Sequence, residues 1–306
     1  MSIAFKGVLP YPDRSPDHSL GAQCITYRKE SSFMNLLHAL ILGALQGVTE
    51  VLPISSSAHL ILVPWLLGWP ESGLTFDVAL HLGTFLALVV YFRRDIVDMA
   101  VSTIDAVKHR SLDTPARRLP FLVIASAVPA ALVGKLFETQ IEELFRSRPL
   151  LIGLFLILFG VGLGLADLFG RKRRFMAQVT VSHALVIGLF QCLALIPGVS
   201  RSGITITAGL MLGFNRVGAA RFSFLMSLPI VAGAALFKML HLLDQGIPAG
   251  EGLPLAAGIV SSAVTGYISV AFLLRFVQKR SIAPFVWYRL IAGGAVVSVI
   301  LTGISG

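Results

Sequence analysis

Six apolar runs constrain the fold of this chain more than any other feature of its sequence. They cover residues 75–93, 117–138, 149–169, 217–241, 253–276 and 285–304. A helix rises about 1.5 Å per residue, so about 20 apolar residues cross the roughly 30 Å hydrocarbon core of a bilayer. Hydrophobic residues make up 55% of the 306 residues and charged residues only 13%, which excludes an ordinary soluble domain. The sequence therefore predicts an all-α polytopic membrane protein with six transmembrane helices.

Four shorter apolar segments remain, in two pairs that are each joined by a polar turn. They cover residues 35–50, 59–69, 182–195 and 203–213. None is long enough to cross the hydrocarbon core comfortably. We therefore expect each pair to form a re-entrant helical hairpin, which enters and leaves the membrane on one side.

The two hairpins also resemble each other in sequence. Residues 145 positions apart match, which pairs Gly43 with Gly188, Gln46 with Gln191, Ser55 with Ser200 and Ser57 with Ser202. Three full crossings lie between the two copies, so the second copy must be upside down relative to the first. The sequence thus predicts an inverted-topology repeat with halves of about 34–170 and 180–306, whose polar turns converge near the bilayer midplane.

Basic residues gather in three loops, and this sets the expected orientation. The clusters are Arg93 to Arg118, Arg171 to Arg174 and Arg275 to Arg280. Basic loops stay on the cytoplasmic side, so both termini are expected on the opposite side. The net charge of +9 is spread over such clusters and does not form a basic patch with interleaved aromatic residues. We therefore expect no nucleic-acid partner.

Residues 1–33 differ from the rest of the chain because they are polar and contain three prolines. They lack the apolar segment of a signal peptide, and we expect them to be disordered. The membrane pattern begins at Met34, which indicates a mis-assigned start, and residues 34–306 are expected to form a single membrane domain. Cys24 and Cys192 lie far apart in unlike surroundings, so neither a disulfide framework nor a thiolate metal site is indicated.

The polar residues that the membrane tolerates concentrate in the two hairpin turns, and such residues usually mark function. Gln46 and Glu50 are four positions apart, so they share one face of a short helix. Pro53 and Pro197 each end a helix, and a serine-bearing turn then leads into the next one. The unpaired N–H groups at the start of these helices predict an anion site.

Four residue types in these turns suit phosphoryl transfer to water. Arg201 offers a planar fork of donors for phosphate oxygens. Glu50 and His59 supply a base and an acid, and Ser56 supplies a possible nucleophile. Structural alternatives remain: the serines 55–57 could only cap a helix, and Arg201 could pair with Glu50 as a purely structural ion pair.

The turn at residues 46–59 and the Pro-Gly-Val-Ser-Arg-Ser-Gly turn at 197–203 resemble the two signature motifs of the undecaprenyl-diphosphatase, or bacitracin-resistance, family. The resemblance extends from about Met34 to the C-terminus. It implies hydrolysis of undecaprenyl diphosphate to undecaprenyl phosphate and inorganic phosphate, which recycles the lipid carrier of peptidoglycan synthesis and confers bacitracin resistance. It also implies a multi-pass protein of the bacterial cell inner membrane whose catalytic cavity faces the periplasm.

The resemblance implies roles for individual residues. Glu50 would be the essential acid, Ser56 the nucleophile, His59 its acid/base partner and Arg201 the phosphate clamp. The expected substrate-binding side chains are Gln46, Ser55, Ser57, Ser200, Ser202 and Thr205, although Thr205 could instead bond to its own helix. Many family members have a glutamate where this chain has Gln46. A site of two carboxylates is therefore not expected here, and the divalent cation that the resemblance implies, Mg²⁺ or Ca²⁺, would be held by Glu50 and the substrate phosphates.

A transporter is the main alternative, because inverted repeats with broken helices also occur in alternating-access carriers. It would be a polyprenyl-phosphate flippase with the same fold. The combination of Glu50, Ser56, His59 and Arg201 favours the enzyme. The expected partners are the polyprenyl diphosphate substrate and membrane lipids, and the glycine-rich spans also allow a homodimer. Asp77 and His81 are expected to be packing residues.

Overall fold

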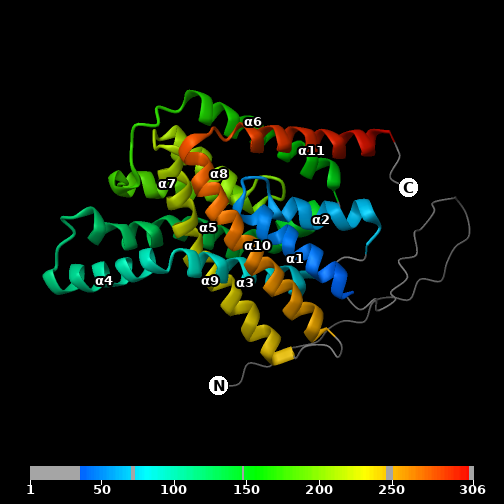
Figure 1. The fold of residues 1–306 in the computed structure, drawn as a ribbon, viewed down its shortest axis with the longest axis horizontal. Helices are drawn as coiled ribbons and strands as arrows, with labels where there is room; N and C mark the ends of the chain where they lie inside the picture. Colours follow the sequence, from blue (N-terminus) through cyan, green and yellow to red (C-terminus); the bar gives the residue numbers. More distant parts are fainter. Residues whose placement is uncertain (1–34, 70–72, 147, 246–250, 303–306) are drawn as a thin grey trace, which may run out of the picture. The chain divides into compact units, whose positions relative to one another are not determined.

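The computed structural model describes residues 35–69, 73–146, 148–245 and 251–302. The predicted disordered segment 1–33 and the alternative start at Met34 lie outside these residues. Within them the regular structure is helical, as predicted, with a single isolated β-bridge (Figure 1). The longer helices are α3 (Gly73–Tyr91), α4 (Arg93–His109), α5 (Pro115–Arg146), α6 (Pro149–Phe169), α9 (Arg216–Gln245), α10 (Gly252–Lys279) and α11 (Ala283–Leu301). The shorter helices are α1 (Leu36–Val51), α2 (Ser56–Leu67), η1 (Met176–Gln178), α7 (Val181–Cys192), η2 (Leu193–Leu195) and α8 (Arg201–Met211).

Several of these helices are long and apolar enough to cross a bilayer. Four segments meet this condition by length and composition: residues Pro115–Phe137 of α5, and the helices α6, α10 and α11. A fifth is added if α3 and α4, which meet at an angle of 72°, count as one bent span. The chain is therefore a multi-pass helical membrane protein, and the predicted runs 75–93 and 217–241 correspond to α3 and α9.

Helix α4 corrects the expectation that the basic segment from Arg93 to Arg118 is a loop, because most of this segment is helical. Its apolar side chains recur at helical spacing and are exposed, with Val97, Val101 and Ile104 at 59%, 60% and 68%. Asp105 lies on the flank of this apolar face and accepts a hydrogen bond of 2.6 Å from Arg117 of α5. Such an amphipathic pattern is weaker than that of a full span, and a window scan for apolar runs misses it.

The four short apolar helices form two similar pairs. Helix α1 is followed by a turn and then α2, and α7 is followed by a turn and then α8. Helix α1 packs along α10, and α7 packs along α5. A Cβ atom on Gly43 would lie 2.4 Å from the Gly258 carbonyl oxygen, and one on Gly188 would lie 2.3 Å from the Ser126 carbonyl oxygen. The matched glycines therefore let each helix approach its neighbour's backbone in the same way.

The main hydrophobic core surrounds α8 and the adjoining part of α9. Every residue from Ser202 to Leu210 is buried, and so are Phe222, Leu225 and Met226. Asp167 at the end of α6 accepts two hydrogen bonds from Arg216 of α9, at 2.6 and 3.1 Å. Helices α6 and α9 both pack against α8, so this ion pair between them holds α8 and its first turn in place.

Candidate active site

The two hairpin turns share an unusual backbone conformation. Ser55 has φ +78° and Ser200 has φ +72°, in the left-handed region that costs a non-glycine residue roughly 1–2 kcal/mol. Each serine directly precedes a helix, α2 or α8. The sequence match between these serines therefore extends to their backbone conformation.

Hydrogen bonds join the two turns to each other. Ser55 Oγ accepts from the Gly198 N–H at 3.2 Å, and Ser202 Oγ donates to the Leu52 carbonyl at 3.2 Å. Ser55 does not cap its own helix, whereas Ser200 Oγ accepts from the Gly203 N–H at 3.1 Å. The turns therefore converge as predicted, and the capping alternative describes Ser200 better than Ser55.

Arg289 of α11 is the centre of this junction and is fully buried. Its guanidinium donates to the carbonyls of Pro53 at 3.2 Å, Val199 at 3.1 Å and Gly198 at 2.7 Å, and its Nε donates to the Leu156 carbonyl at 3.2 Å. Pro53 and Gly198 are also 145 positions apart, so one side chain satisfies equivalent carbonyls of both turns. Lipid offers no hydrogen-bond donors to these non-helical carbonyls, so the protein supplies them from Arg289.

Glu50 is the point where the predicted catalytic residues meet. Arg201 Nη2 donates to its Oε1, and Ser56 Oγ donates to its Oε2. Gln46 Nε2 donates to Oε2 as well, at 3.3 Å. The Glu50 side chain is only 7% exposed, so a charged carboxylate there depends on these donors. Three of the four predicted catalytic residues are thus in direct contact.

His81 of α3 is a further neighbour of Glu50 that the sequence analysis assigned to packing. Its Nε2 lies 3.5 Å from Glu50 Oε2, and its Nδ1 lies 2.8 Å from the Asp77 carbonyl oxygen. The carbonyl bond orients the ring so that Nε2 faces the carboxylate. An ionisable side chain inside a predicted span was a signal that could have found it.

His59 lies elsewhere in the junction. Its Nδ1 is 2.7 Å from the Ser55 carbonyl oxygen, and its Nε2 is 2.6 Å from the Tyr288 hydroxyl. The two rings also stack, with centroids 5.6 Å apart. Both ring nitrogens therefore have partners that hold the first turn against α11.

The remaining predicted polar residues have internal contacts too. Thr205 Oγ1 donates to the Arg201 carbonyl at 2.8 Å and lies 2.6 Å from Ser223 Oγ, so the bond to its own helix exists. Ser57 Oγ is 3.3 Å from Ser55 Oγ. In the part of the chain that the structure describes, the buried Gln46 Oε1 has no hydrogen-bond partner. Gln46 therefore keeps an acceptor for a water molecule or a substrate.

The space beside these residues is small. A cavity of about 10 Å³ lies between Glu50, Arg201, Ser223 and Ser227, roughly the room that one water molecule needs. Among the described residues no cluster of three or more His, Cys, Asp or Glu side chains could hold a metal ion. Glu50 is the single carboxylate that lines this cavity, and Arg201, Ser56 and Gln46 donate to it.

Comparisons with known proteins agree on one family. A family model described as "Bacitracin resistance protein BacA" matches residues 39–295. An undecaprenyl-diphosphatase of Trichlorobacter lovleyi is 60% identical over 89% of this chain and 99% of its own length. The undecaprenyl-diphosphatase of Geobacter sulfurreducens is 63% identical over 87% of this chain and 98% of its own length. That of Moorella thermoacetica is 50% identical over 87% of this chain and 98% of its own length.

Proposed function

Because this chain belongs to the bacitracin resistance protein BacA family, we propose that it hydrolyses undecaprenyl diphosphate to undecaprenyl phosphate and inorganic phosphate. It is a phosphatase, and its product is the lipid carrier that peptidoglycan synthesis reuses. Faster recycling of the diphosphate also explains resistance to bacitracin. The observation that supports this best is the Glu50 carboxylate, which joins Ser56 of the first hairpin to Arg201 of the second.

The contacts of Glu50 suggest how the reaction proceeds. Ser56 Oγ attacks the terminal phosphorus while Glu50, which already accepts its hydrogen bond, takes the proton. The bond from phosphorus to the bridging oxygen breaks, and undecaprenyl phosphate leaves. Water then attacks the phosphoserine, which releases inorganic phosphate and restores Ser56. A direct attack by water that Ser56 positions would use the same base.

Arg201 supplies the positive charge that the transferring phosphoryl group needs. Within the described residues only its Nη2 has a side-chain partner, so its other donors remain for phosphate oxygens. It stands at the first turn of α8, where unpaired N–H groups also favour an anion. A diphosphate is much larger than the present cavity, so substrate entry requires the side chains around Glu50 and Arg201 to separate.

A divalent cation belongs to this proposal. Glu50 would hold Mg²⁺ or Ca²⁺ together with the substrate phosphates, and the cation would neutralise charge on the diphosphate. We expect EDTA to abolish phosphate release by the purified protein and added Mg²⁺ or Ca²⁺ to restore it. Full activity after thorough chelation, with metal content checked by elemental analysis, would remove the cation from the mechanism.

We also propose the finer topology. The chain crosses the membrane six times and forms two re-entrant hairpins, α1–α2 and α7–α8, in an inverted repeat. Four features support it: the short lengths of these helices, their shared turn conformation, the matched glycine contacts and the distribution of basic residues. The catalytic cavity then opens towards the periplasm.

The decisive experiment measures phosphate release from a prenyl diphosphate by purified protein in detergent. Glu50→Gln and Arg201→Gln should each lower release by about 10²-fold or more, because a general base and a phosphate clamp are lost. Asp95→Asn and Arg221→Gln are matched controls, since these residues form another ion pair between helices. An equal loss of phosphate release in the two control variants would mean that ion pairs between helices, rather than the catalytic groups, limit the activity. A folded wild type that binds substrate but releases no phosphate would favour the flippase.

A further inference from the structure

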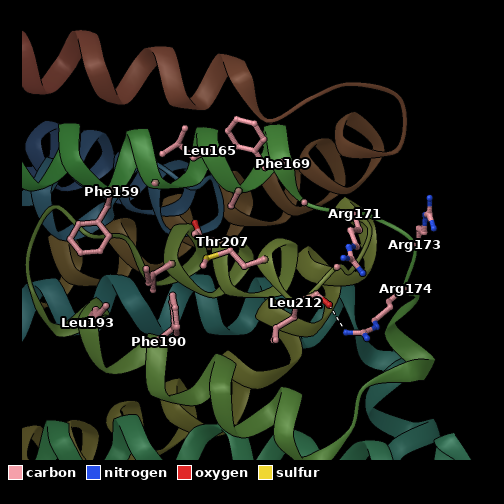
Figure 2. A pocket seen from close by; sticks show the side chains of 16 residues that line it. Phe159, Leu165, Phe169, Arg171, Arg173, Arg174, Phe190, Leu193, Thr207 and Leu212 are labelled. Atoms are coloured by element: carbon pink, nitrogen blue, oxygen red, sulfur yellow. Dashed lines mark hydrogen bonds between the residues drawn. The ribbon is translucent and has the colours of Figure 1, made fainter.

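A second cavity lies on the other side of α8 from the candidate active site. It is a groove of about 990 Å³ between α6, α7 and α8, next to the basic segment that follows α6 (Figure 2). Its α8 residues are Ile204, Thr207 and Met211, whereas Arg201 and Thr205 contact the catalytic side. The groove is therefore separate from the reacting groups.

One end of the groove is strongly basic. Arg171, Arg173 and Arg174 line it together, and Figure 2 shows them gathered at that end. Arg174 is anchored, because its Nη1 donates to the Leu212 carbonyl at 2.6 Å and lies 3.0 Å from His183 Nε2. Arg171 and Arg173 are exposed and have no ion-pair partner among the described residues.

No acidic residue offsets this charge from within the groove lining that the structure describes. The nearby carboxylate of Asp167 is paired with basic residues other than these three arginines. Arg216 donates two hydrogen bonds to it, and Lys172 Nζ lies 4.0 Å from its Oδ1. The three arginines thus present a net positive charge to whatever occupies the groove. A phosphate group is the anion that such a set of planar donors recognises best.

The rest of the groove is apolar. Phe159, Leu165 and Phe169 line it from α6, and Phe190 and Leu193 line the opposite side (Figure 2). Phe159 and Leu193 lie at the end away from the arginines. Helix α6 is one of the segments long and apolar enough to span the bilayer, so this wall faces a lipid environment. An acyl chain fits such a wall, and a free phosphate ion would leave it uncovered.

We propose that this groove binds an anionic phospholipid of the surrounding membrane. Its phosphate contacts Arg171 and Arg173, and an acyl chain lies along Phe159, Phe169 and Phe190. Basic pockets between membrane helices bind anionic headgroups in this manner. A phospholipid is favoured over a prenyl phosphate because Leu165, Phe169 and Met211 of the groove are exposed to the surrounding membrane, in which phospholipid is the most abundant lipid.

The first test is native mass spectrometry of the full chain with equal amounts of phosphatidylglycerol and phosphatidylcholine of the same acyl chains. The wild type should retain phosphatidylglycerol preferentially. Each arginine near an anionic group contributes roughly a fivefold gain in affinity. The double variant Arg171→Gln/Arg173→Gln should therefore bind phosphatidylglycerol about 25-fold more weakly. Lys279→Gln/Arg280→Gln removes the same charge from another exposed segment and should leave retention unchanged.

The second test blocks the apolar part of the groove without touching a charge. Gly162 lines the groove, and a Cβ atom there would meet nothing within 4 Å. Gly162→Phe should therefore place a ring in the path of the acyl chain and lower lipid retention at least tenfold, while phosphate release is kept. Gly294→Phe is the matched control, because its Cβ would also meet nothing within 4 Å.

Three outcomes would overturn the proposal. Equal retention of the two phospholipids by the wild type would mean that the arginines select no headgroup. Equal losses in the Lys279/Arg280 double variant would mean a general charge effect. Displacement of phosphatidylglycerol by an equimolar prenyl monophosphate would make the groove a site for the reaction product. All variants must first elute as folded protein in size-exclusion chromatography.

Discussion

Glu50 illustrates how much of this site depends on single side chains from different helices. Its carboxylate receives Gln46 from its own helix, Ser56 from α2 and Arg201 from α8, with His81 of α3 nearby. A buried charge of this kind is tolerated only when such donors surround it, and removal of one partner leaves the others uncompensated. The Glu50 carboxylate thereby gives Ser56 a base and keeps Arg201 next to it.

The two histidines can be separated by experiment. His81→Gln should lower kcat about 10²-fold, leave KM nearly unchanged and remove one limb of the pH–rate profile, because His81 contacts the base Glu50. His59→Gln should instead lower the melting temperature, since both nitrogens of His59 bind structural partners. Tyr288→Phe is the matched control, because it removes only the hydroxyl that contacts His59. If His59→Gln abolishes release while His81→Gln does not, His59 is the acid/base group that the sequence suggests.

At the scale of helices, close packing at matched glycines holds each hairpin in place. Gly43→Ala and Gly188→Ala should each lower the free energy of unfolding by about 1–3 kcal/mol, because the added methyl group would lie against a neighbouring carbonyl oxygen. Thermal unfolding in detergent measures this, with Gly294→Ala as control, where the methyl group meets nothing within 4 Å. A loss at only one of the two glycines would argue against equivalent roles for the two hairpins.

Arg289 connects elements rather than reacting groups. Arg289→Gln should lower the free energy of unfolding by about 3 kcal/mol or more, since the carbonyls of Pro53, Gly198 and Leu156 lose their donor inside the protein. Arg275→Gln on the exposed side of α10 is the control and should change the melting temperature little. A folded Arg289→Gln variant of unchanged stability would mean that water or neighbouring groups satisfy these carbonyls.

At the scale of the whole molecule, the proposed topology places the segment after α10 on the cytoplasmic side and the start of α6 on the other. In a Cys24→Ala/Cys192→Ala background, Arg148→Cys should react with an impermeant maleimide on intact spheroplasts. Lys279→Cys should react only after the membrane is opened. Both side chains are exposed, so access across the membrane decides the result. Labelling of both cysteines in intact spheroplasts would contradict an odd number of crossings between them.

The helical membrane class, the two pairs of short helices and the family could all be predicted from the amino-acid sequence. Apolar length is a local property that the bilayer thickness imposes, and the match at 145 positions is visible without coordinates. The meeting of Glu50, Ser56 and Arg201 was also predictable, because membrane-embedded polar residues concentrate in the two turns. These features depend on short stretches of chain whose chemistry has few alternatives.

The partners of the individual polar groups, by contrast, could not be predicted without the three-dimensional structure. Nothing in the spacing of residues places His81 rather than His59 beside Glu50, since that contact depends on how α3 packs against α1. The same holds for Arg289, which lies more than 80 residues from the carbonyls that it binds. The groove behind α8 is likewise a property of three packed helices. Side-chain contacts between distant segments depend on packing geometry, and packing geometry is set by the whole fold.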